Sequence, residues 1–320
     1  MAVITILNGI LLFQNDYPRY NDPTMLTSGD SASKDPPQEA GKGRLPTVMD
    51  TGAARWGWIL IPSLILAGFT AWIYFADCNA FYFFLANRSL QFMGDRFWSL
   101  VTLWGDGLFA FAVMTFFYRR KPRLVWAFVF AALLFLIFGH GLKNLLNVAR
   151  PPAIIPAGRF HLIGPTWKTN AFPSGHSAMA FILAGSFFMT VRRFWSRIIL
   201  IGLASLVALS RVVVGVHWPL DVAAGSLLGW WLGWIGISLA ERWRWCEAFA
   251  ARKVLGVFLV LASVLLIFFH DTGYTLSLTM QRFFGGILLA VGIYELLALF
   301  GIELVGKLHS DSKASDHRRD

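Results

Sequence analysis

Charged side chains are scarce in this chain of 320 residues, because Asp, Glu, Lys and Arg together make up 14% of it. A soluble globular domain usually holds about 25% charged residues, so the composition argues against a cytosolic enzyme. Cysteine is also scarce: Cys78 and Cys246 are the two in the chain, which excludes a disulfide scaffold. The sequence has no internal repeat and no cofactor fingerprint, since Gly105-Asp106-Gly107 lies within an apolar run and follows no strand.

Hydrophobic residues, in contrast, make up 56% of the chain, and its mean hydropathy is +0.58. An apolar run of about 20 residues forms a helix that spans roughly 30 Å of hydrocarbon. From Trp56 onward the chain holds eight such runs: Trp56–Phe75, Trp98–Tyr118, Leu124–Leu146, Ser174–Val191, Ile198–Val216, Pro219–Ala240, Val254–Phe269 and Phe283–Val305. The sequence therefore predicts an all-α polytopic membrane protein.

The basic excess of the chain lies within its apolar part. Lys and Arg number 28 against 18 Asp and Glu, a net charge of +10, and residues 56–306 hold 19 of the basic and 9 of the acidic residues. A nucleic-acid binder concentrates such charge on a soluble patch, so no nucleic-acid partner is predicted. Positive charge beside apolar runs instead indicates contact with anionic lipid head groups and a bias that sets topology.

The loops between the runs differ in charge. Those at 119–123, 192–197 and 241–253 are short and densely basic, whereas the long segment 147–173 falls on the opposite side. Lys and Arg accumulate in short cytoplasmic loops. We therefore expect these short loops and both tails to be cytoplasmic, and segment 147–173 to face the outer compartment.

The two ends of the chain are predicted to lie outside the membrane. Residues 1–55 include a stretch too polar to fold alone and lack the basic start and cleavage site of a signal peptide, so we interpret them as a largely disordered cytoplasmic segment. Residues 307–320 are expected to form a cytoplasmic tail. The same topology puts Cys78 and Cys246 on opposite sides of the membrane, which excludes a disulfide between them.

Three short segments on the predicted outer side concentrate polar residues. In the first, Lys143 and Arg150 are seven residues apart, so two helical turns would place them on one face, about 10 Å apart. The second, Ser174-Gly175-His176, opens an apolar run, and the free N–H groups of a helix N-terminus bind anions. In the third, His217 and Asp221 are four residues apart, so the carboxylate can accept from one imidazole nitrogen and leave the other free to react.

Together these segments supply what phosphoryl transfer needs. Three cations, Lys143, Arg150 and Arg211, can neutralise phosphate oxygens. One histidine can attack phosphorus while the other protonates the leaving oxygen. The sequence offers no cluster of carboxylates to hold Mg²⁺, so we predict a metal-independent reaction with no metal site and no cofactor.

The order of the three blocks resembles the phosphatidic acid phosphatase type 2 family, which shares its site with the vanadium haloperoxidases. The family pattern is Lys-x6-Arg-Pro, then Pro-Ser-Gly-His, then Ser-Arg-x5-His-x3-Asp. The chain matches it at Lys143, Arg150, Pro151, Pro173 to His176, Ser210, Arg211, His217 and Asp221. The resemblance implies a six-helix phosphatase core at 56–240, with two additional transmembrane helices at 241–306.

The resemblance also implies a role for each matched side chain. His217 would be the nucleophile, Asp221 would orient it, and His176 would be the general acid. The implied phosphate ligands are Lys143, Arg150, Ser174, Gly175 and Arg211.

A membrane lipid phosphatase is the function that the resemblance implies, in the bacterial inner membrane with its site facing the periplasm or outer leaflet. The substrate would be a phosphate monoester or pyrophosphate of a membrane lipid: polyprenyl pyrophosphate, phosphatidylglycerol phosphate, phosphatidic acid or a lipid A phosphate. The alternatives are a lipid phosphotransferase using the same phospho-histidine, a vanadate-dependent haloperoxidase, and a non-catalytic lipid transporter or scaffold. The sequence predicts no oligomeric state.

Other polar residues are placed outside the site. Asp106 is expected to be a structural hydrogen-bond partner between helices rather than a catalytic acid. His140 would line the cavity or tune Lys143, and His161 would lie in a solvated outer loop with Arg159 and Lys168. Glu295, in the last apolar run, is given no role.

Overall fold

The computed structural model describes residues 52–191 and 193–316, with side chains for 56–191 and 193–301, and every regular element in these ranges is helical. The predicted segment 1–55 lies outside the described residues except for the start of the first helix, and residues 317–320 also lie outside. The helices in chain order are α2 (Gly52–Phe75), α3 (Asn79–Ser89), α4 (Asp95–Leu103), α5 (Gly107–Val113), α6 (Pro122–Leu146), α7 (Pro151–Ile154), α8 (Gly175–Phe188), α9 (Phe194–Val213), α10 (Pro219–Arg242), α11 (Phe249–Phe268) and α12 (Thr275–Asp316). The predicted all-α fold is confirmed.

Six helices of the described chain are long and apolar enough to cross a membrane: α2, α6, α9, α10, α11 and α12. Two of the eight predicted runs differ from a single long helix. The run Trp98–Tyr118 is broken into α4 and α5, which meet at an angle of 64°. The break falls where Asp106 caps α5 by accepting from the backbone N–H of Phe109, so a polar residue inside an apolar run starts a new helix.

The other exception is the fourth run, where α8 is a helix of 14 residues. The last helix also differs from the prediction, because it begins at Thr275 rather than near Phe283 and continues to Asp316. The predicted tail at 307–320 is therefore helical through Asp316.

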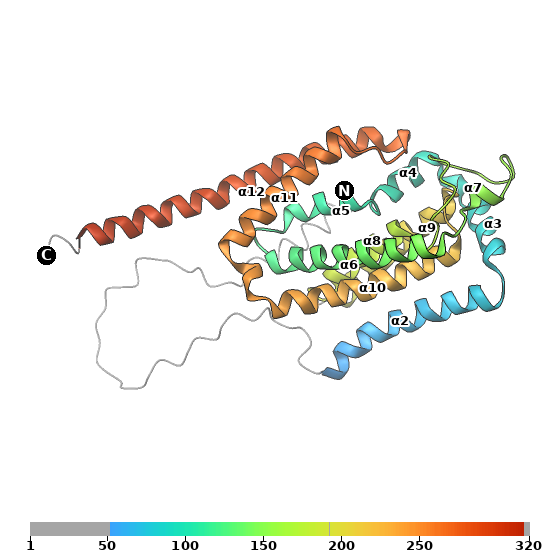
Figure 1. Cartoon of the computed structure of the whole chain (residues 1–320), viewed down its shortest axis with the longest axis horizontal. Helices are drawn as coiled ribbons and strands as arrows, with labels where there is room; N and C mark the ends of the chain where they lie inside the picture. The colour runs from blue at the N-terminus through green and yellow to red at the C-terminus, as the bar shows by residue number, and fades with distance from the viewer. Residues whose placement is uncertain (1–51, 192, 317–320) are drawn as a thin grey trace. The chain divides into compact units, whose positions relative to one another are not determined.

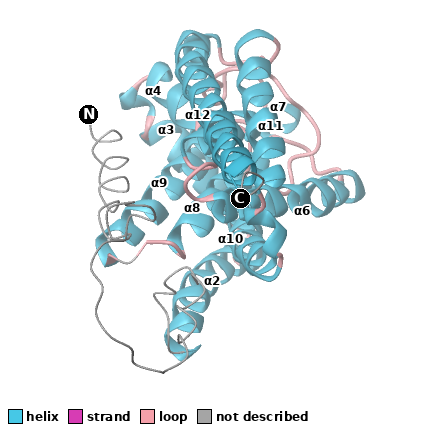
Figure 2. Ribbon diagram, turned by 90° about the vertical axis from the view of Figure 1, so that its left-hand side faces the viewer, coloured by secondary structure: helices cyan, strands magenta, loops and turns pink. Residues whose placement is uncertain are grey.

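The core forms around α8 and α10, which pack against each other and against α6 and α9 (Figure 1, Figure 2). Glycine on α10 allows this close approach. A Cβ atom at Gly229 would lie 2.2 Å from the backbone oxygen of Ala178, and one at Gly225 would lie 2.5 Å from that of Ser174. Small residues let membrane helices pack backbone to backbone. The contact at Gly225 brings the start of α8 against the first turns of α10.

The two C-terminal helices form a hairpin outside this core. α11 and α12 pack along each other, and both contact α5, while α12 also contacts α4 (Figure 1). At one end of the hairpin Glu295 forms an ion pair with Arg119, which gives this glutamate a structural partner that the sequence did not reveal.

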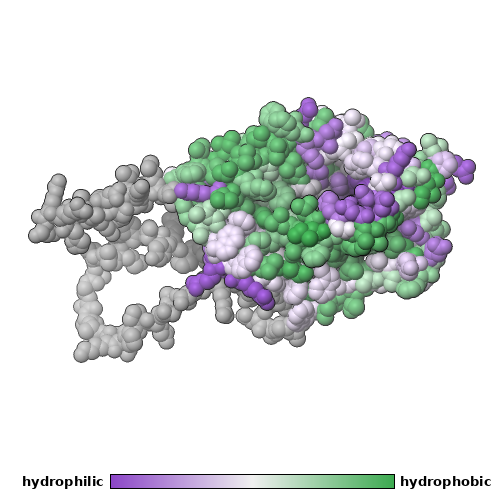
Figure 3. Space-filling model, viewed as in Figure 1, coloured by the Kyte–Doolittle hydropathy of each residue, from purple (hydrophilic) through white to green (hydrophobic). Residues whose placement is uncertain are grey.

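Large apolar side chains cover the outward faces of α2, α6, α11 and α12, as expected for helices that contact lipid. The space-filling view shows this apolar surface along the helices, with hydrophilic residues gathered toward the end where α3 and α7 lie (Figure 3). The chain is a multi-pass membrane protein.

Candidate active site

The three polar segments predicted from the sequence meet around one cavity of about 400 Å³. Six of the predicted residues line it. These are Lys143, Arg150, Gly175, His176, Arg211 and His217, joined by Trp167, Lys168, Thr169 and Asn170 from the loop before α8. The folded chain thus brings together the ends of α6, α8, α9 and α10.

His217 lies in the turn between α9 and α10 and is 2% exposed. Its Nδ1 is 3.3 Å from Oδ2 of Asp221, and its Nε2 is 3.1 Å from Nη1 of Arg150. A guanidinium can only donate, so Nε2 is the accepting nitrogen and the ring proton sits on Nδ1, facing the carboxylate. Burial lowers the pKa of His217 well below its ordinary value, and the charge of Arg150 lowers it further. In this arrangement the Nε2 lone pair of His217 points toward Arg150.

Asp221 is fixed by the start of α10. Pro219 occupies the first turn, where its missing N–H costs no hydrogen bond, and an acidic residue in the first turn complements the helix dipole. Oδ2 of Asp221 also accepts from the backbone N–H of Trp218 at 2.9 Å. The backbone oxygen of Asp221 accepts from the N–H of Ser174 at 2.9 Å, which joins the turn that carries His217 to the start of α8.

Ser174 caps α8 rather than lining the cavity. Its Oγ accepts from the Ser177 hydroxyl at 2.9 Å and from the Ser177 N–H at 3.4 Å, and the residue is fully buried. The first turn of α8, with Gly175 and His176, faces the cavity. The predicted helix N-terminus is therefore present, while a direct contact between Ser174 and phosphate stays a prediction.

The cations Lys143 and Arg150 do not share a helix face, which corrects the sequence expectation. α6 ends at Leu146 because Asn147 adopts a left-handed conformation (φ 41°), and Arg150 follows in the extended segment before Pro151. Both side chains still reach one place, since the backbone oxygen of Asn170 accepts from Lys143 Nζ at 3.3 Å and from Arg150 Nη2 at 3.2 Å.

Arg150 is held mainly by backbone oxygens. Nε donates to the oxygen of Thr169 at 2.8 Å, and Nη1 lies 3.3 Å from that of Val216. The ring of Trp167 lies near two guanidinium carbons, 5.2 Å from that of Arg150 and 5.9 Å from that of Arg211. These partners of Arg150 are neutral, so among the described residues no carboxylate forms an ion pair with Lys143, Arg150 or Arg211.

Arg211 is fully buried at the end of α9. Its Nη1 donates to Oγ1 of Thr102 at 2.6 Å and to the hydroxyl of Tyr274 at 2.8 Å. Neither partner could be recognised from the sequence, because Thr102 lies in an apolar run and Tyr274 follows the last motif. Trp167 and Asn170 were also missed, since a loop residue carries no periodicity.

The remaining polar residues have partners away from the cavity. Asp106, besides capping α5, lies 2.9 Å from Nε2 of His270, in agreement with its predicted structural role. His161 lies 2.8 Å from Oδ1 of Asp95. His140 is exposed and does not line the cavity, whereas Lys168 does.

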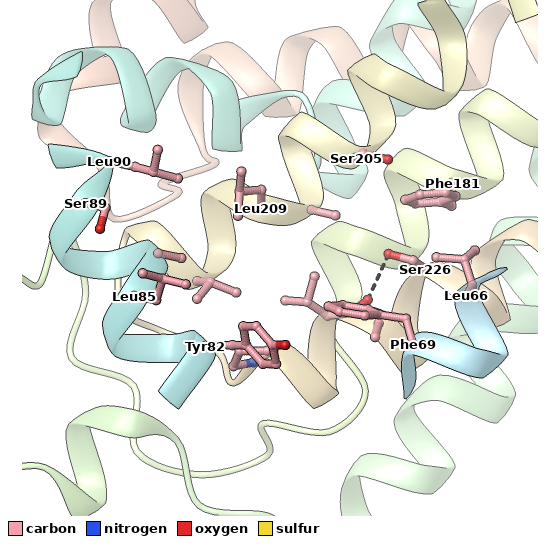
Figure 4. Close-up of a pocket in the computed structure, with 16 residues that line it drawn as sticks. Leu66, Phe69, Tyr82, Leu85, Ser89, Leu90, Phe181, Ser205, Leu209 and Ser226 are labelled. Atoms are coloured by element: carbon pink, nitrogen blue, oxygen red, sulfur yellow. Dashed lines mark hydrogen bonds between the residues drawn. The ribbon is translucent and has the colours of Figure 1, made fainter. Parts of the chain in front are cut away.

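A second cavity, of about 470 Å³, has a different character. It lies between α2, α3, α9 and α10, and its lining is almost wholly apolar (Figure 4). The labelled Ser226 hydroxyl turns back to the oxygen of Val222 on its own helix, at 2.8 Å. This cavity has no cation with which to bind an anion, so we assign the chemistry to the charged cavity.

The motif region also matches a known family. Residues 124–245 match the sequence model of the PAP2 superfamily, which confirms the predicted resemblance. The likeness is confined to this segment, which is less than half of the chain. The match runs from the start of α6 through α10. Thr102 lies before the matched segment, and Tyr274 lies after it.

Individual relatives resemble parts of the chain. An undecaprenyl-diphosphatase of Sulfolobus acidocaldarius is 30% identical over 128 residues, which are 38% of this chain and 58% of that protein. A lipid A 1-phosphatase of Rhizobium johnstonii is 28% identical over 148 residues, 43% of this chain and 60% of that protein. The chain thus spans under two thirds of these PAP2 relatives. The crystal structure of Aquifex aeolicus LpxE aligns with a TM-score of 0.46 and 29% identity over 50% of this chain and 94% of that one.

No group of three or more His, Cys, Asp or Glu side chains suited to a metal ion occurs within residues 52–191 and 193–316. Cys78 and Cys246 are both free thiols, and Cys246 is fully buried.

Proposed function

We propose that the chain is a membrane lipid phosphatase that acts through a phosphorylated His217. The observation that carries the proposal is the meeting of Lys143, Arg150 and Arg211 around the accepting Nε2 of His217 in a single cavity. A dianionic phosphate matches this charge, and preorganised cations stabilise the further charge that develops during phosphoryl transfer.

The reaction would proceed in two steps. In the first, Nε2 of His217 forms a bond to phosphorus while the bond from phosphorus to the lipid oxygen breaks, and His176 donates a proton to the departing oxygen. In the second, water attacks the phospho-histidine and gives its proton to His176, which releases inorganic phosphate and restores the lone pair on Nε2. Asp221 stabilises the ring charge that appears on His217 in each step.

The printed names of the relatives support a lipid substrate. One relative acts on undecaprenyl diphosphate and another on lipid A at its 1-phosphate, and both substrates carry an anionic phosphate at the end of an apolar body. We infer that this chain hydrolyses a phosphate monoester or diphosphate of that kind. The basic loops at 119–123 and 241–253 support an orientation in the inner membrane with the cavity facing the periplasm.

The test uses the purified full chain in detergent and a panel of undecaprenyl diphosphate, lipid A, phosphatidylglycerol phosphate and phosphatidic acid. Release of inorganic phosphate from at least one substrate is expected, and His140→Ala, a change at an exposed histidine outside the cavity, should keep that activity. Transfer of the phosphoryl group to a second lipid without phosphate release would instead identify a phosphotransferase. A chain that releases no phosphate and transfers none would refute the proposal.

A further inference from the structure

The guanidinium of Arg211 is buried, and three of its five N–H donors have no hydrogen-bond partner among the described residues. Nη1 has two acceptors, but Nε and Nη2 have no hydrogen-bond partner among the described residues. Burial of charged donors without partners costs free energy, so such donors are expected where a ligand supplies the acceptors. The orphaned donors belong to a side chain that lines the charged cavity, which points to an anion as that ligand.

The geometry of a guanidinium makes the choice of nitrogens informative. Nε and Nη2 lie side by side on one edge of the plane, and this edge can bind two oxygens of one phosphate at once. Nη1 lies on the opposite side of the group. Because Thr102 and Tyr274 both accept from Nη1, they fix the plane of the guanidinium without using the edge that suits phosphate.

We propose that Tyr274 and Thr102 are positioning residues, which hold Arg211 so that its Nε and Nη2 bind two phosphate oxygens. The inference rests on the proposed function, because it names further residues that serve the same cavity. Tyr274 precedes α12 and lies outside the segment that matches the PAP2 superfamily. The C-terminal hairpin would thus complete a site whose reactive groups all come from the core.

Close packing keeps Tyr274 in place. The residue is 2% exposed, and its ring lies against Gly164 in the loop before α8, where a Cβ atom would be 2.5 Å from Cε1 of the tyrosine. A Cβ atom at Gly273 would be 2.9 Å from the ring of Pro165. The turn before α12 and the loop that carries Trp167 are therefore packed together, so the hydroxyl cannot leave Arg211 without displacing that loop.

Two further contacts anchor the same turn. Nε2 of Gln281, in the first turns of α12, donates to the backbone oxygen of His270 at 2.8 Å and to that of Leu266 at 2.9 Å. The ring of His270 in turn contacts Asp106 at the break between α4 and α5, next to the helix that carries Thr102. Both acceptors of Arg211 are thus held on one rigid framework.

The first experiment compares Tyr274→Phe and Thr102→Val with the wild-type chain, purified at full length in detergent. Orthovanadate is the probe, and its dissociation constant is measured by calorimetry. Each variant should bind it on the order of tenfold more weakly, the usual effect of losing one hydrogen bond to a charged group. Tyr118→Phe is the matched control, since Tyr118 is also fully buried but its hydroxyl has no partner among the described residues. This control should bind vanadate like the wild type.

The second experiment asks whether the effect passes through Arg211. In an Arg211→Lys background there is no Nη1, so adding Tyr274→Phe should change vanadate affinity by less than about twofold. A residue that acted only on stability would lower the melting temperature and weaken vanadate binding equally in both backgrounds. Equal loss in both backgrounds, or wild-type affinity in both Tyr274→Phe and Thr102→Val, would overturn the inference.

Binding and turnover separate this inference from the proposed function. If the wild-type chain binds vanadate but releases phosphate from no lipid, the proposed function fails and the calorimetric comparison still tests Tyr274 and Thr102. If the wild-type chain binds neither vanadate nor inorganic phosphate, the inference fails as well. A KM for the lipid substrate that rises in Tyr274→Phe while vanadate affinity falls would support both.

Discussion

The motif-bearing region from Lys143 to Asp221 and the C-terminal hairpin of α11 and α12 contribute to the same end of the molecule in different ways. The first region supplies every charged or titratable side chain of the cavity. The hairpin lines none of it, yet Tyr274 contacts Arg211 and His270 contacts Asp106. The groups that would react and the groups that orient them can therefore come from separate parts of a chain. Ordered sequence motifs identify the reacting groups but not the orienting ones.

The largest effect should follow from removing the proposed nucleophile. In His217→Ala the cavity keeps its three cations but loses the imidazole proposed to bond to phosphorus, so turnover should be abolished. Phosphate release from a lipid substrate by the purified variant is the measurement. Near-normal release would assign the nucleophile to another residue. The contrast between a motif region that reacts and a hairpin that orients would then fail.

Loss of the partner of His217 should have a smaller effect. Asp221→Asn keeps the size of the side chain but removes the charge that holds the ring proton on Nδ1, so kcat should fall by a factor on the order of 10²–10⁴. The backbone bonds from Trp218 and Ser174 help to preserve the fold. A variant with unchanged melting temperature and unchanged kcat would contradict the role given to Asp221.

Labelling from one side of the membrane sharpens the comparison, because the cavity loop and the hairpin turn should lie on the same side. In a Cys78→Ser background, Ala157→Cys and Asp271→Cys should react with a membrane-impermeant maleimide in intact spheroplasts, whereas Arg244→Cys should react only after permeabilisation. All three positions are exposed. Cys246 is fully buried and so cannot report on the cytoplasmic side. The reverse labelling pattern would move the cavity to the cytoplasmic leaflet.

Much of the fold and of the charged cavity could be predicted from the sequence. Apolar runs identify the long helices, because hydrophobic length is a property of a continuous segment. The ordered blocks brought Lys143, Arg150, His176, Arg211 and His217 to one cavity. The helix break at Asp106 was not predicted, because a single polar residue between two glycines in an apolar run does not show whether it caps a new helix or bonds to a neighbouring one.

The orientation of Arg211 was beyond prediction for the same reason. Its acceptors are Thr102 in α4 and Tyr274 in the turn before α12, which carry no motif, and a single hydroxyl resembles any other in the sequence. The expected helical face for Lys143 and Arg150 was wrong because Asn147 ends α6 early. Spacing alone does not show where a helix stops.

The contact between His270 and Asp106, called here the hairpin tether, should matter more for stability than for activity. The hydrogen bond to Asp106 raises the pKa of His270 above its ordinary value, and the charge of Asp271 adds to this. The stabilisation is therefore complete below the unfolded-state pKa of about 6.5 and is lost as pH rises through the higher folded-state pKa. His270→Gln should melt a few degrees below the wild type at acidic pH, and the difference should close at alkaline pH.

The control for this tether is His161→Gln, whose partner Asp95 is largely solvent-accessible. An exposed pair contributes little, so its variant should melt close to the wild type at every pH. A difference in melting temperature between His270→Gln and wild type that does not change with pH would show that the ring stabilises the fold by packing and not by its charge.

The smallest expected effect is that of metal removal. Because the cations of the cavity are side chains, phosphate release should be unchanged after EDTA treatment, and orthovanadate should inhibit by imitating five-coordinate phosphorus at His217. Loss of activity with EDTA and its recovery with Mg²⁺ would contradict a reaction carried by protein groups alone.

The shortness of α8 gives the bilayer itself a part in the reaction. Its 14 residues, at 1.5 Å each, extend over about 21 Å, which is less than the roughly 30 Å of a typical hydrocarbon layer. A helix of this length does not reach both surfaces of such a layer, so we expect the first turn of α8, where His176 lies, to be recessed from the outer one. A lipid phosphate must sink toward this level or the membrane must thin around it, at a cost that grows with the mismatch. We therefore predict that membrane thickness affects the proposed reaction: phosphate release should be faster after reconstitution into short-chain lipids than into long-chain ones.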